Sequence, residues 1–587
     1  MPCPNLGTKW RGESARSRSV MQACAGGGPD KARAYWIQYC DQAESREKEI
    51  MGRPIRAGST TRPLGLRRRS RCAVARLPFV VVCASAVVAH ADVVSVPAPG
   101  AEYRVDASIG WESGGLVVKG TETIALTNTT GRPLAQLAIE WESASKEAIR
   151  VSSGGAPVEL EAATPGELWG PLLLALPEAV APGGEIQLDI AFKLRYDQFD
   201  GAHATLVKWH PRLWWGVPAH GDYEVKLDVP PELRLGTSGR RDPGAGRHIV
   251  RDARSFGLFL GKGHRVLEGD AGDVRVRVIH TPAAADCAGI LLETAVDAVD
   301  FYRERFGFYP YKVLTIVPGE DRPIGGYPVA TALVAMHGIE HMAEKEERYW
   351  RWITAHEVAH QYWGEHVLEG DRPGWLWIGL GLYADREYVR ARGLGPMEHE
   401  AIVAQYVEAV REGFDTALTL DPAEHGAAPH DFNGAVVHGK GYSAIGALAC
   451  LLGRETFDRV CRRCLQAFGG RRMGAEAFRK VCEKESDQDL DWFFEQWVES
   501  NRYLSYELSG VACVKENDRY VSRARVDRLG TLDMPVPVAA FFKDGTAQRC
   551  FTERLMRTQE VVFASRSPLV IMRLDPEHRL ANVLPPP

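Results

Sequence analysis

Alternating hydrophobic and polar positions mark the first long region of the chain as strands. The run YRVDASIGW places Tyr103, Val105, Ala107, Ile109 and Trp111 on one face, which is the period-two pattern of a half-buried strand. YEVKLDV repeats the pattern further along, and turns rich in Gly, Pro and Asn, such as NTTGRP, separate the runs. Because half-buried alternating strands are typical of antiparallel sheets, we predict an antiparallel β domain over residues 92–281.

The hydrophobic period then changes to that of helices. CAGILLETAVDAVDFYRERF is typical of an amphipathic helix, FGFYPYKVLTIVPG of a turn and a buried strand, and HMAEKEERYWRWITAHEVAHQYWGEH of one long helix. Helical segments continue to about residue 502, after which alternation returns and Lys543-Asp544-Gly545 predicts a hairpin turn. The expected fold class is α+β multidomain: an N-terminal antiparallel β domain, a mainly helical domain over residues 282–502, and a small β domain over residues 503–587.

The first 91 residues differ from the rest of the chain. They contain 16 Lys+Arg and 6 Asp+Glu, and a run of arginines precedes LPFVVVCASAVVA. A basic segment, a short apolar run and the small-x-small sequence Ala89-His90-Ala91 are the parts of a secretory signal. We therefore expect residues 1–91 to be a leader cleaved before Asp92, and the remainder to be exported to the periplasm or the extracellular space. The apolar run is shorter than the roughly 20 residues of a spanning helix, so no stable membrane span is predicted.

Charge and cysteine content narrow the function further. Without the leader, 71 − 16 = 55 basic and 76 − 6 = 70 acidic residues remain, a net charge near −15 with neutral histidine. Such an acidic chain is a poor partner for nucleic acid. Seven of the 12 cysteines lie after the leader without framework spacing. Cys461 and Cys464 lie in a helical pattern, where we interpret them as packing residues.

The stretch HEVAH is the strongest candidate for chemistry. Residues four apart share one helix face, so His356 and His360 can direct two imidazole nitrogens at one metal ion. Glu357 can then reach a metal-bound water and act as general base. Two ordinary histidines beside a glutamate are the alternative. The buried character of the helix, with apolar Ile353, Val358 and Trp363, favours the metal site because an unpaired buried charge is costly.

Several motifs in order give this sequence a family resemblance. FGFYPY, IGGYPVATALV, HEVAHQYWG, WLWIGLGLY and HGKGYSAIGAL follow one another in a way that resembles the M1 family of zinc aminopeptidases. WHPRLWWGVPAHGDYEVKLDVP is similar to that family's N-terminal β domain, and LDPEHRL to the end of its small β-sandwich. The resemblance implies a thermolysin-like catalytic domain over residues 282–502, a C-terminal β-sandwich, a Zn²⁺ cofactor and a peptide or protein substrate.

The third zinc ligand of the family is missing from this sequence. The family's WLNEGFA-like helix supplies a glutamate, and the matching run WLWIGLG has Ile378 at that position. Asp385 lies seven residues further, roughly 10 Å along a helix, which we judge too far for a substitute. Glu369 and Asp371 on the preceding loop remain possible ligands.

Two further positions differ from the family pattern. The GAMEN strand, which binds the substrate's free amine through a glutamate, is replaced by IGGYP, so Gly325, Gly326 and Tyr327 are the expected substrate-binding residues without a carboxylate. The tyrosine of YxKG, which donates to the oxyanion, is replaced by His438, while Lys440 is retained. His438 can donate to the oxyanion, complete a three-histidine metal site, or only fill space.

Two functions therefore remain open. The first is a secreted zinc-dependent metallopeptidase of the M1 kind, with Glu357 and His438 in catalytic roles and His356 and His360 on the metal. The second is a catalytically inactive M1 relative that binds peptides or proteins. If the chain hydrolyses peptides, we expect blocked N-termini to be accepted as readily as free ones, because the amine-binding glutamate is absent.

Overall fold

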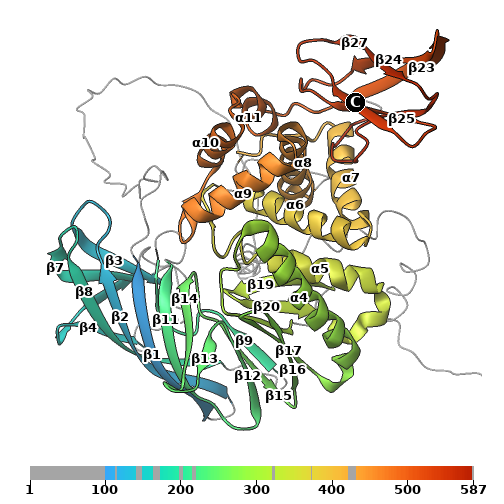
Figure 1. Cartoon of the computed structure of the whole chain (residues 1–587). Coiled ribbons are helices and arrows are strands. Elements are labelled where there is room, and N and C mark those ends of the chain that lie inside the picture. Colours follow the sequence, from blue (N-terminus) through green and yellow to red (C-terminus); the bar gives the residue numbers. More distant parts are fainter. Residues whose placement is uncertain are drawn as a thin grey trace, which may run out of the picture. The chain divides into compact units, whose positions relative to one another are not determined.

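The computed structural model describes residues 100–112, 115–140, 149–162, 172–196, 203–214, 220–319, 324–371, 373–420 and 431–584. The predicted leader and its cleavage site lie outside these residues. The described part is mixed α/β, with a strand-rich N-terminal region followed by a helical segment (Figure 1).

The largest sheet of the N-terminal region has the strand order β13-β14-β11-β1-β2-β8-β4-β5. Its strands are β1 (Ala101–Glu112), β2 (Gly115–Thr127), β4 (Ile149–Ser153), β5 (Ala156–Pro157), β8 (Glu185–Tyr196), β11 (Gly221–Asp228), β13 (Arg240–Asp242) and β14 (Arg247–Ala253). In β1 the alternation predicted from sequence is confirmed, except that Trp111 is 43% exposed near the strand end. The sheet is not wholly antiparallel, since β1 pairs with β11 in parallel.

Two smaller sheets complete this region. The orders are β10-β3-β7-β6 and β12-β15-β9. Their strands are β3 (Leu134–Glu140), β6 (Glu159–Ala162), β7 (Leu172–Val180), β9 (His203–Leu206), β10 (Arg212–Leu213), β12 (Leu233–Thr237) and β15 (Leu258–Lys262).

A five-stranded sheet of order β16-β17-β18-β20-β19 leads into the helical segment. Its strands are β16 (Arg265–Ala271), β17 (Val274–His280), β18 (Val313–Pro318), β19 (Gly325–Ala330) and β20 (Leu333–His337). β17 pairs in parallel with β18, so this sheet contains strands from both sides of the predicted boundary at residue 281. Helix α4 (Ala285–Phe306), predicted from its period, packs on β16 and β17.

The expected long helix around HEVAH is shorter in the structure. A 3₁₀ segment, η4 (Ile339–Glu344), precedes α5 (Glu347–Ala359), and His360 is the C-terminal cap residue of α5. The break falls at Lys345 and Glu346, whose backbones are extended. Four tryptophans on or after this helix are buried: Trp350, Trp352, Trp363 and Trp375. Of these, Trp352 packs beside the HEVAH motif, with its ring centroid 5.7 Å from that of His356.

The remaining helices follow in sequence. They are α6 (Trp375–Arg392), α7 (Met397–Arg411), the π-helix η6 (Asn433–Lys440), α8 (Gly441–Leu452), α9 (Arg454–Phe468), α10 (Ala475–Ser486) and α11 (Asp491–Trp497), with a short 3₁₀ turn η3 (Pro282–Ala284) before α4 and a strand pair β21 (Leu368–Glu369) and β22 (Arg472–Met473). By length and apolar composition residues 433–452 could cross a membrane, but 89% of the apolar stretch is buried inside the protein.

Cys461 and Cys464 are buried in α9, as their interpretation as packing residues requires.

The C-terminal strands form two three-stranded sheets, β23-β24-β27 and β26-β25-β28. Their strands are β23 (Tyr506–Glu516), β24 (Arg519–Arg528), β25 (Pro537–Phe542), β26 (Ala547–Phe551), β27 (Thr558–Ser565) and β28 (Leu569–Leu574). The predicted hairpin is confirmed: β25 and β26 pair antiparallel, and Gly545 has φ +83° in the turn.

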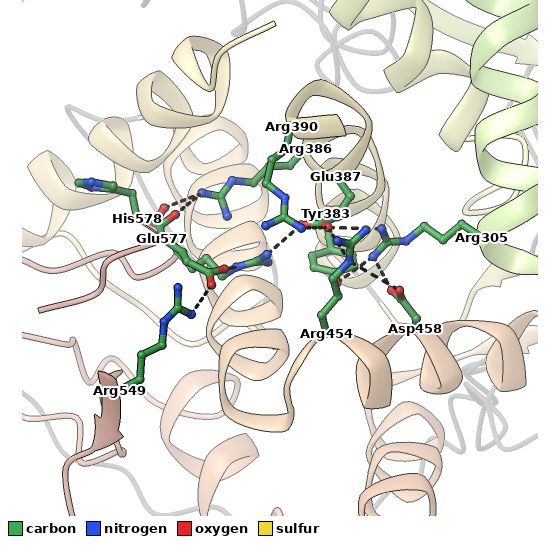
Figure 2. A network of polar contacts seen from close by, with 11 residues as sticks. Arg305, Tyr383, Arg386, Glu387, Arg390, Arg454, Asp458, Arg549, Glu577 and His578 are labelled. Atoms are coloured by element: carbon green, nitrogen blue, oxygen red, sulfur yellow. Dashed lines mark hydrogen bonds and ion pairs between the residues drawn. The ribbon is translucent and has the colours of Figure 1, made fainter. Parts of the chain in front are cut away.

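A buried carboxylate on α6 ties this β region to the helices. Glu387, 1% exposed, contacts four arginines: Arg305 at 3.3 Å, Arg390 at 3.3 Å, Arg454 at 3.2 Å and Arg579 at 2.9 Å (Figure 2). Burial disfavours the charged form, but the arginines outweigh it and hold the pKa of Glu387 below its usual value. Arg579, in the segment after β28, is thereby linked to α6.

Candidate metal centre and its surroundings

Two imidazole rings converge at the end of α5. His356 and His360 are four residues apart, so both rings leave the same face of the chain. Their Nε2 atoms lie 3.0 Å apart, and the residues are 1% and 0% exposed. The metal-binding pair expected from HEVAH is therefore brought together in the structure.

The hydrogen bonds of the other ring nitrogens orient both rings. Nδ1 of His356 lies 2.6 Å from a carboxylate oxygen of Asp385, and Nδ1 of His360 lies 3.1 Å from the carbonyl oxygen of Trp363. Both partners are acceptors, so each Nδ1 carries the proton and donates. The Nε2 lone pairs then face each other, an arrangement that only a proton or a cation between them can stabilise.

The pKa shifts of the two histidines favour a single proton shared between the rings. Burial opposes the charge on His356, but the hydrogen bond and the charge of Asp385 outweigh it and raise the pKa of His356. Burial and the neighbouring His356 hold the pKa of His360 well below its usual value. A charged His356 donating from Nε2 to neutral His360 satisfies both rings. A metal ion would take the place of that proton.

Asp385 takes a place at the candidate site that the sequence did not reveal. Its carboxylate accepts hydrogen bonds from His356, from Nε1 of Trp352 at 3.2 Å and from Nε2 of His399. The sequence suggests Asp385 only as a distant replacement ligand, whereas in the structure its carboxylate binds Nδ1 of His356 and orients that ring. One feature of the sequence could have indicated this position. Asp385 follows Ile378 by seven residues, about two helical turns, so both side chains leave α6 on the same side.

The position of the missing third ligand is apolar in the structure. Ile378 is 1% exposed on α6. The ring of Trp377 lies 4.8 Å from that of His360, and a Cβ on Gly381 would lie 3.0 Å from the His360 ring. These contacts place α6 directly against His360, with an apolar side chain at the position of the missing ligand; Asp385, the carboxylate further along α6, hydrogen-bonds Nδ1 of His356 instead.

The loop carboxylates do not replace the missing ligand. Asp371 accepts a hydrogen bond from the backbone N–H of Ala475 at the start of α10, and Glu369 lies in β21 beside Gly374. Within the described residues, the ligand atoms of three His, Cys, Asp or Glu side chains come within 4.8 Å of one another only at Glu483, Asp489 and Asp491. The HEVAH residues therefore fit two ligands of a metal ion and do not fit the family's three-ligand zinc site.

Glu357 faces β19, the strand of the expected substrate-binding residues. A Cβ added to Gly326 of β19 would lie 2.8 Å from Cγ and 3.0 Å from Oε1 of Glu357. Glycine at this position therefore leaves the space that the Glu357 side chain occupies. Of the other two expected substrate-binding residues, Gly325 begins β19, and Tyr327 stacks on His337 with ring centroids 4.9 Å apart.

His438 lies near the histidine pair without joining it. It is 3% exposed in η6, and its Nδ1 lies 2.9 Å from the carbonyl oxygen of Asn433, to which it donates. Burial, with a smaller effect from His356, lowers the pKa of His438 to about 4. A neutral imidazole therefore stands close to the pair, but in this structure it does not bring a third ligand atom within 4.8 Å of both histidines.

Lys440, the other family position in HGKG, has a structural role. Its Nζ lies 2.9 Å from Asp415, 2.6 Å from the carbonyl oxygen of Thr416 and 2.7 Å from that of Ser500. The side chain is fully buried. All three donors of the ammonium group are thus used in holding the end of η6 to two loops.

Comparison with known proteins identifies this segment. Residues 291–497 match the family described as the peptidase family M1 domain. Curated proteins to which this chain is similar include Aminopeptidase M1 of Arabidopsis thaliana, 23% identical over 265 residues, and Aminopeptidase M1-A of Oryza sativa subsp. japonica, 24% identical over 243 residues.

The alignments span only part of each protein. They cover 42% and 39% of this chain but only 30% and 27% of the plant aminopeptidases. Together with the M1 domain, they support a metallopeptidase-like function.

Proposed function

We propose that this chain is an exported M1-type protein that binds peptides through its catalytic-domain fold and hydrolyses them poorly or not at all. The observation that carries the proposal is buried Ile378, which stands where the family's third zinc ligand is expected. The M1 match and the two plant aminopeptidases support the peptide as ligand. The secretory signal predicted in residues 1–91 supports export.

The size of the expected loss supports weak turnover. Removing even an outer partner of a metal ligand lowers affinity or activity about 10- to 100-fold, so the absence of a direct ligand has a larger effect. Loss of an oxyanion donor lowers turnover by a further factor of about 10² to 10³, and here His438 replaces the donating tyrosine. The missing metal ligand and the missing oxyanion donor both slow the same reaction, the hydrolysis of a peptide bond.

Strand β19 supports peptide binding. It is the last strand in the order β16-β17-β18-β20-β19, so one of its edges has no paired strand in that sheet. An extended peptide can add to such an edge through backbone hydrogen bonds. Such binding depends on the backbone of residues 325–330 and requires neither the third zinc ligand nor the amine-binding glutamate.

The test restores the missing ligand. Alanyl p-nitroanilide and its N-acetylated form are incubated with the parent protein, Ile378→Glu and the matched control Ile378→Gln, each with added Zn²⁺. We expect hydrolysis at background level in the parent and Ile378→Gln, and a gain of at least 10-fold in Ile378→Glu. Binding of a fluorescent alanine-rich peptide should be saturable in the parent.

The competing function is the zinc peptidase. The retained residues His356, Glu357 and His360, with Glu357 beside β19, are the observation that favours it. Zinc-dependent hydrolysis by the parent that disappears in Glu357→Gln would establish the peptidase and refute our proposal. Absence of both hydrolysis and peptide binding would also refute it.

A further inference from the structure

The turn that joins β19 to β20 has a strained backbone. Its two residues are Thr331 and Ala332, and Ala332 has φ +55°, in the left-handed region that a residue with a Cβ rarely adopts. Both residues are fully buried, so their polar groups need partners within the protein. Such a conformation persists only where the surrounding structure holds it.

The residues that follow His360 hold this turn. Oε1 of Gln361 accepts a hydrogen bond from the N–H of Ala332 at 2.8 Å, and Oε2 of Glu365 accepts one from the hydroxyl of Thr331 at 2.7 Å. Gln361 and Glu365 are 0% and 3% exposed. The N–H of Glu365 in turn donates to the carbonyl oxygen of His360 at 3.2 Å. The turn is therefore bonded directly to the segment that leaves the histidine pair.

The hydrogen bonds of Gln361 explain why an amide occupies this position. Its Nε2 has no hydrogen-bond partner among the residues that the structure describes. A buried donor without a partner is costly, and an apolar side chain would fill the same space without that cost. The acceptor that Gln361 offers to Ala332 is what distinguishes it from an apolar residue.

The N-terminal β region holds the same turn through Thr331. The Thr331 hydroxyl oxygen accepts from the backbone N–H groups of Arg254 at 3.1 Å and Ser255 at 3.3 Å. Because the hydroxyl also donates to Glu365, its one donor and both of its acceptor positions are used. The guanidinium of Arg254 lies 3.5 Å from the Glu365 carboxylate. Two regions of the chain thus fix the position of one turn.

The turn fixes one end of β19, and a close contact fixes the other. Near the start of the strand, a Cβ on Gly326 would lie 2.8 Å from Cγ of Glu357, so the backbone is pressed against α5. We propose that Gln361 and Glu365 are positioning residues that hold the strained turn and thereby keep the free edge of β19 in place for a peptide. This inference rests on the proposed function, in which that edge binds the peptide. The two side chains would set peptide affinity without touching the peptide.

The test removes the acceptor and then the strain. Gln361→Met keeps the size of the side chain but leaves the N–H of Ala332 without a partner. We expect a fluorescent alanine-rich peptide to bind about 10-fold more weakly, because fewer molecules hold the competent strand geometry. Hydrogen–deuterium exchange of residues 325–332 in the peptide-free protein should become faster. Ala332→Gly in the same background should recover part of both losses, since glycine adopts positive φ without strain.

Two further variants complete the experiment. Thr331→Val removes the bond to Glu365 and should also speed exchange of residues 325–332, whereas the conservative Thr331→Ser should not. Gln466→Met, at an exposed position of α9, should change neither exchange nor peptide affinity.

The two readouts separate this inference from the proposed function. A parent protein that binds no peptide would refute the peptide-binding function, whereas the exchange rates would still test the hold on the turn. Unchanged exchange of residues 325–332 in Gln361→Met would overturn the inference, as would a double variant with Ala332→Gly that recovers nothing. Faster exchange with unchanged peptide affinity would also overturn it, because Gln361 would then stabilise the turn without positioning β19.

Discussion

The carboxylate of Asp385 lies 2.6 Å from Nδ1 of His356 and holds that ring in place. The bond fixes which nitrogen of His356 faces His360, and thus creates the site at which a proton or a metal ion can sit. The two histidines are held in this orientation although Ile378, two turns earlier on α6, cannot bind a metal ion. The orientation of the histidines and the completeness of the metal site are therefore separate properties in this protein.

Replacing Asp385 with asparagine should disturb the pair. An amide nitrogen facing Nδ1 of His356 would set two donors against each other, or leave Trp352 and His399 without their acceptor. We expect the free energy of unfolding to fall by about 1–3 kcal/mol, measured by urea denaturation. Zinc affinity should fall about 10- to 100-fold. Unchanged values for both would show that Asp385 does not orient His356; Asp518→Asn is the control.

Gly326 should not tolerate a side chain. In Gly326→Ala the new Cβ would lie 2.7 Å from Sδ of Met336 and 2.8 Å from Cγ of Glu357, so these groups must move. We expect a loss of about 1–3 kcal/mol in unfolding free energy, measured by thermal and urea denaturation. Gly289→Ala in α4, where no atom lies within 4 Å of the added Cβ, should instead stabilise by about 0.5–1 kcal/mol. Equal effects of the two variants would contradict this account of the close approach.

Removing the charge of Glu387 should loosen the C-terminal strands. Glu387→Gln leaves Arg305 and Arg579 buried with reduced compensation, and breaking such a buried pair costs about 3–5 kcal/mol. The measurement is hydrogen exchange, with increased exchange expected in residues 569–584. The exposed pair of Arg502 and Glu495, 3.8 Å apart, provides the control, since Glu495→Gln should change stability by less than about 1 kcal/mol. Similar effects of both variants would disprove the role of Glu387.

Acid should destabilise the metal-free protein through its buried neutral histidines. The pKa of His438 is about 4 when folded and about 6.5 when unfolded. Between these values the unfolded chain binds more protons, so stability is present above about pH 6.5 and lost as the pH falls towards 4, by up to about 3 kcal/mol for this residue.

The pH dependence is measured as the urea midpoint between pH 7 and 4. The pKa of His248 is also lowered to about 4, mainly by burial, so the loss should be smaller, but not absent, in His438→Gln. An identical pH profile in parent and variant would mean that His438 is not buried and neutral in solution.

Local pattern predicted much of the fold. Strand alternation in β1, the period of α4 and the Asp544-Gly545 turn depend on neighbouring residues, and the structure confirms them. The parallel pairing of β1 with β11 could not be predicted, because it joins residues more than 100 positions apart. The division of the HEVAH helix at Lys345 and Glu346 was missed because charged residues there fit a helix equally well.

The candidate site was predicted where a short motif defines it. The convergence of His356 and His360 follows from a four-residue spacing, whereas the bond between Asp385 and His399 requires α6 and α7 to pack together. The absence of a carboxylate at Ile378 was visible in the sequence. That no other described residue completes the site depends on the tertiary structure.

The most direct test of the central claim is the zinc affinity of the untagged parent protein beside Ile378→Glu, with Ile378→Gln and His356→Ala as controls. Bound zinc is measured by mass spectrometry after dialysis against buffers of fixed free zinc. A two-histidine site predicts that Ile378→Glu binds one zinc ion at least 10-fold more tightly than the parent and Ile378→Gln, and that His356→Ala binds none. One tightly bound zinc ion in the parent, with no gain in Ile378→Glu, would contradict the account and show that another residue completes the site.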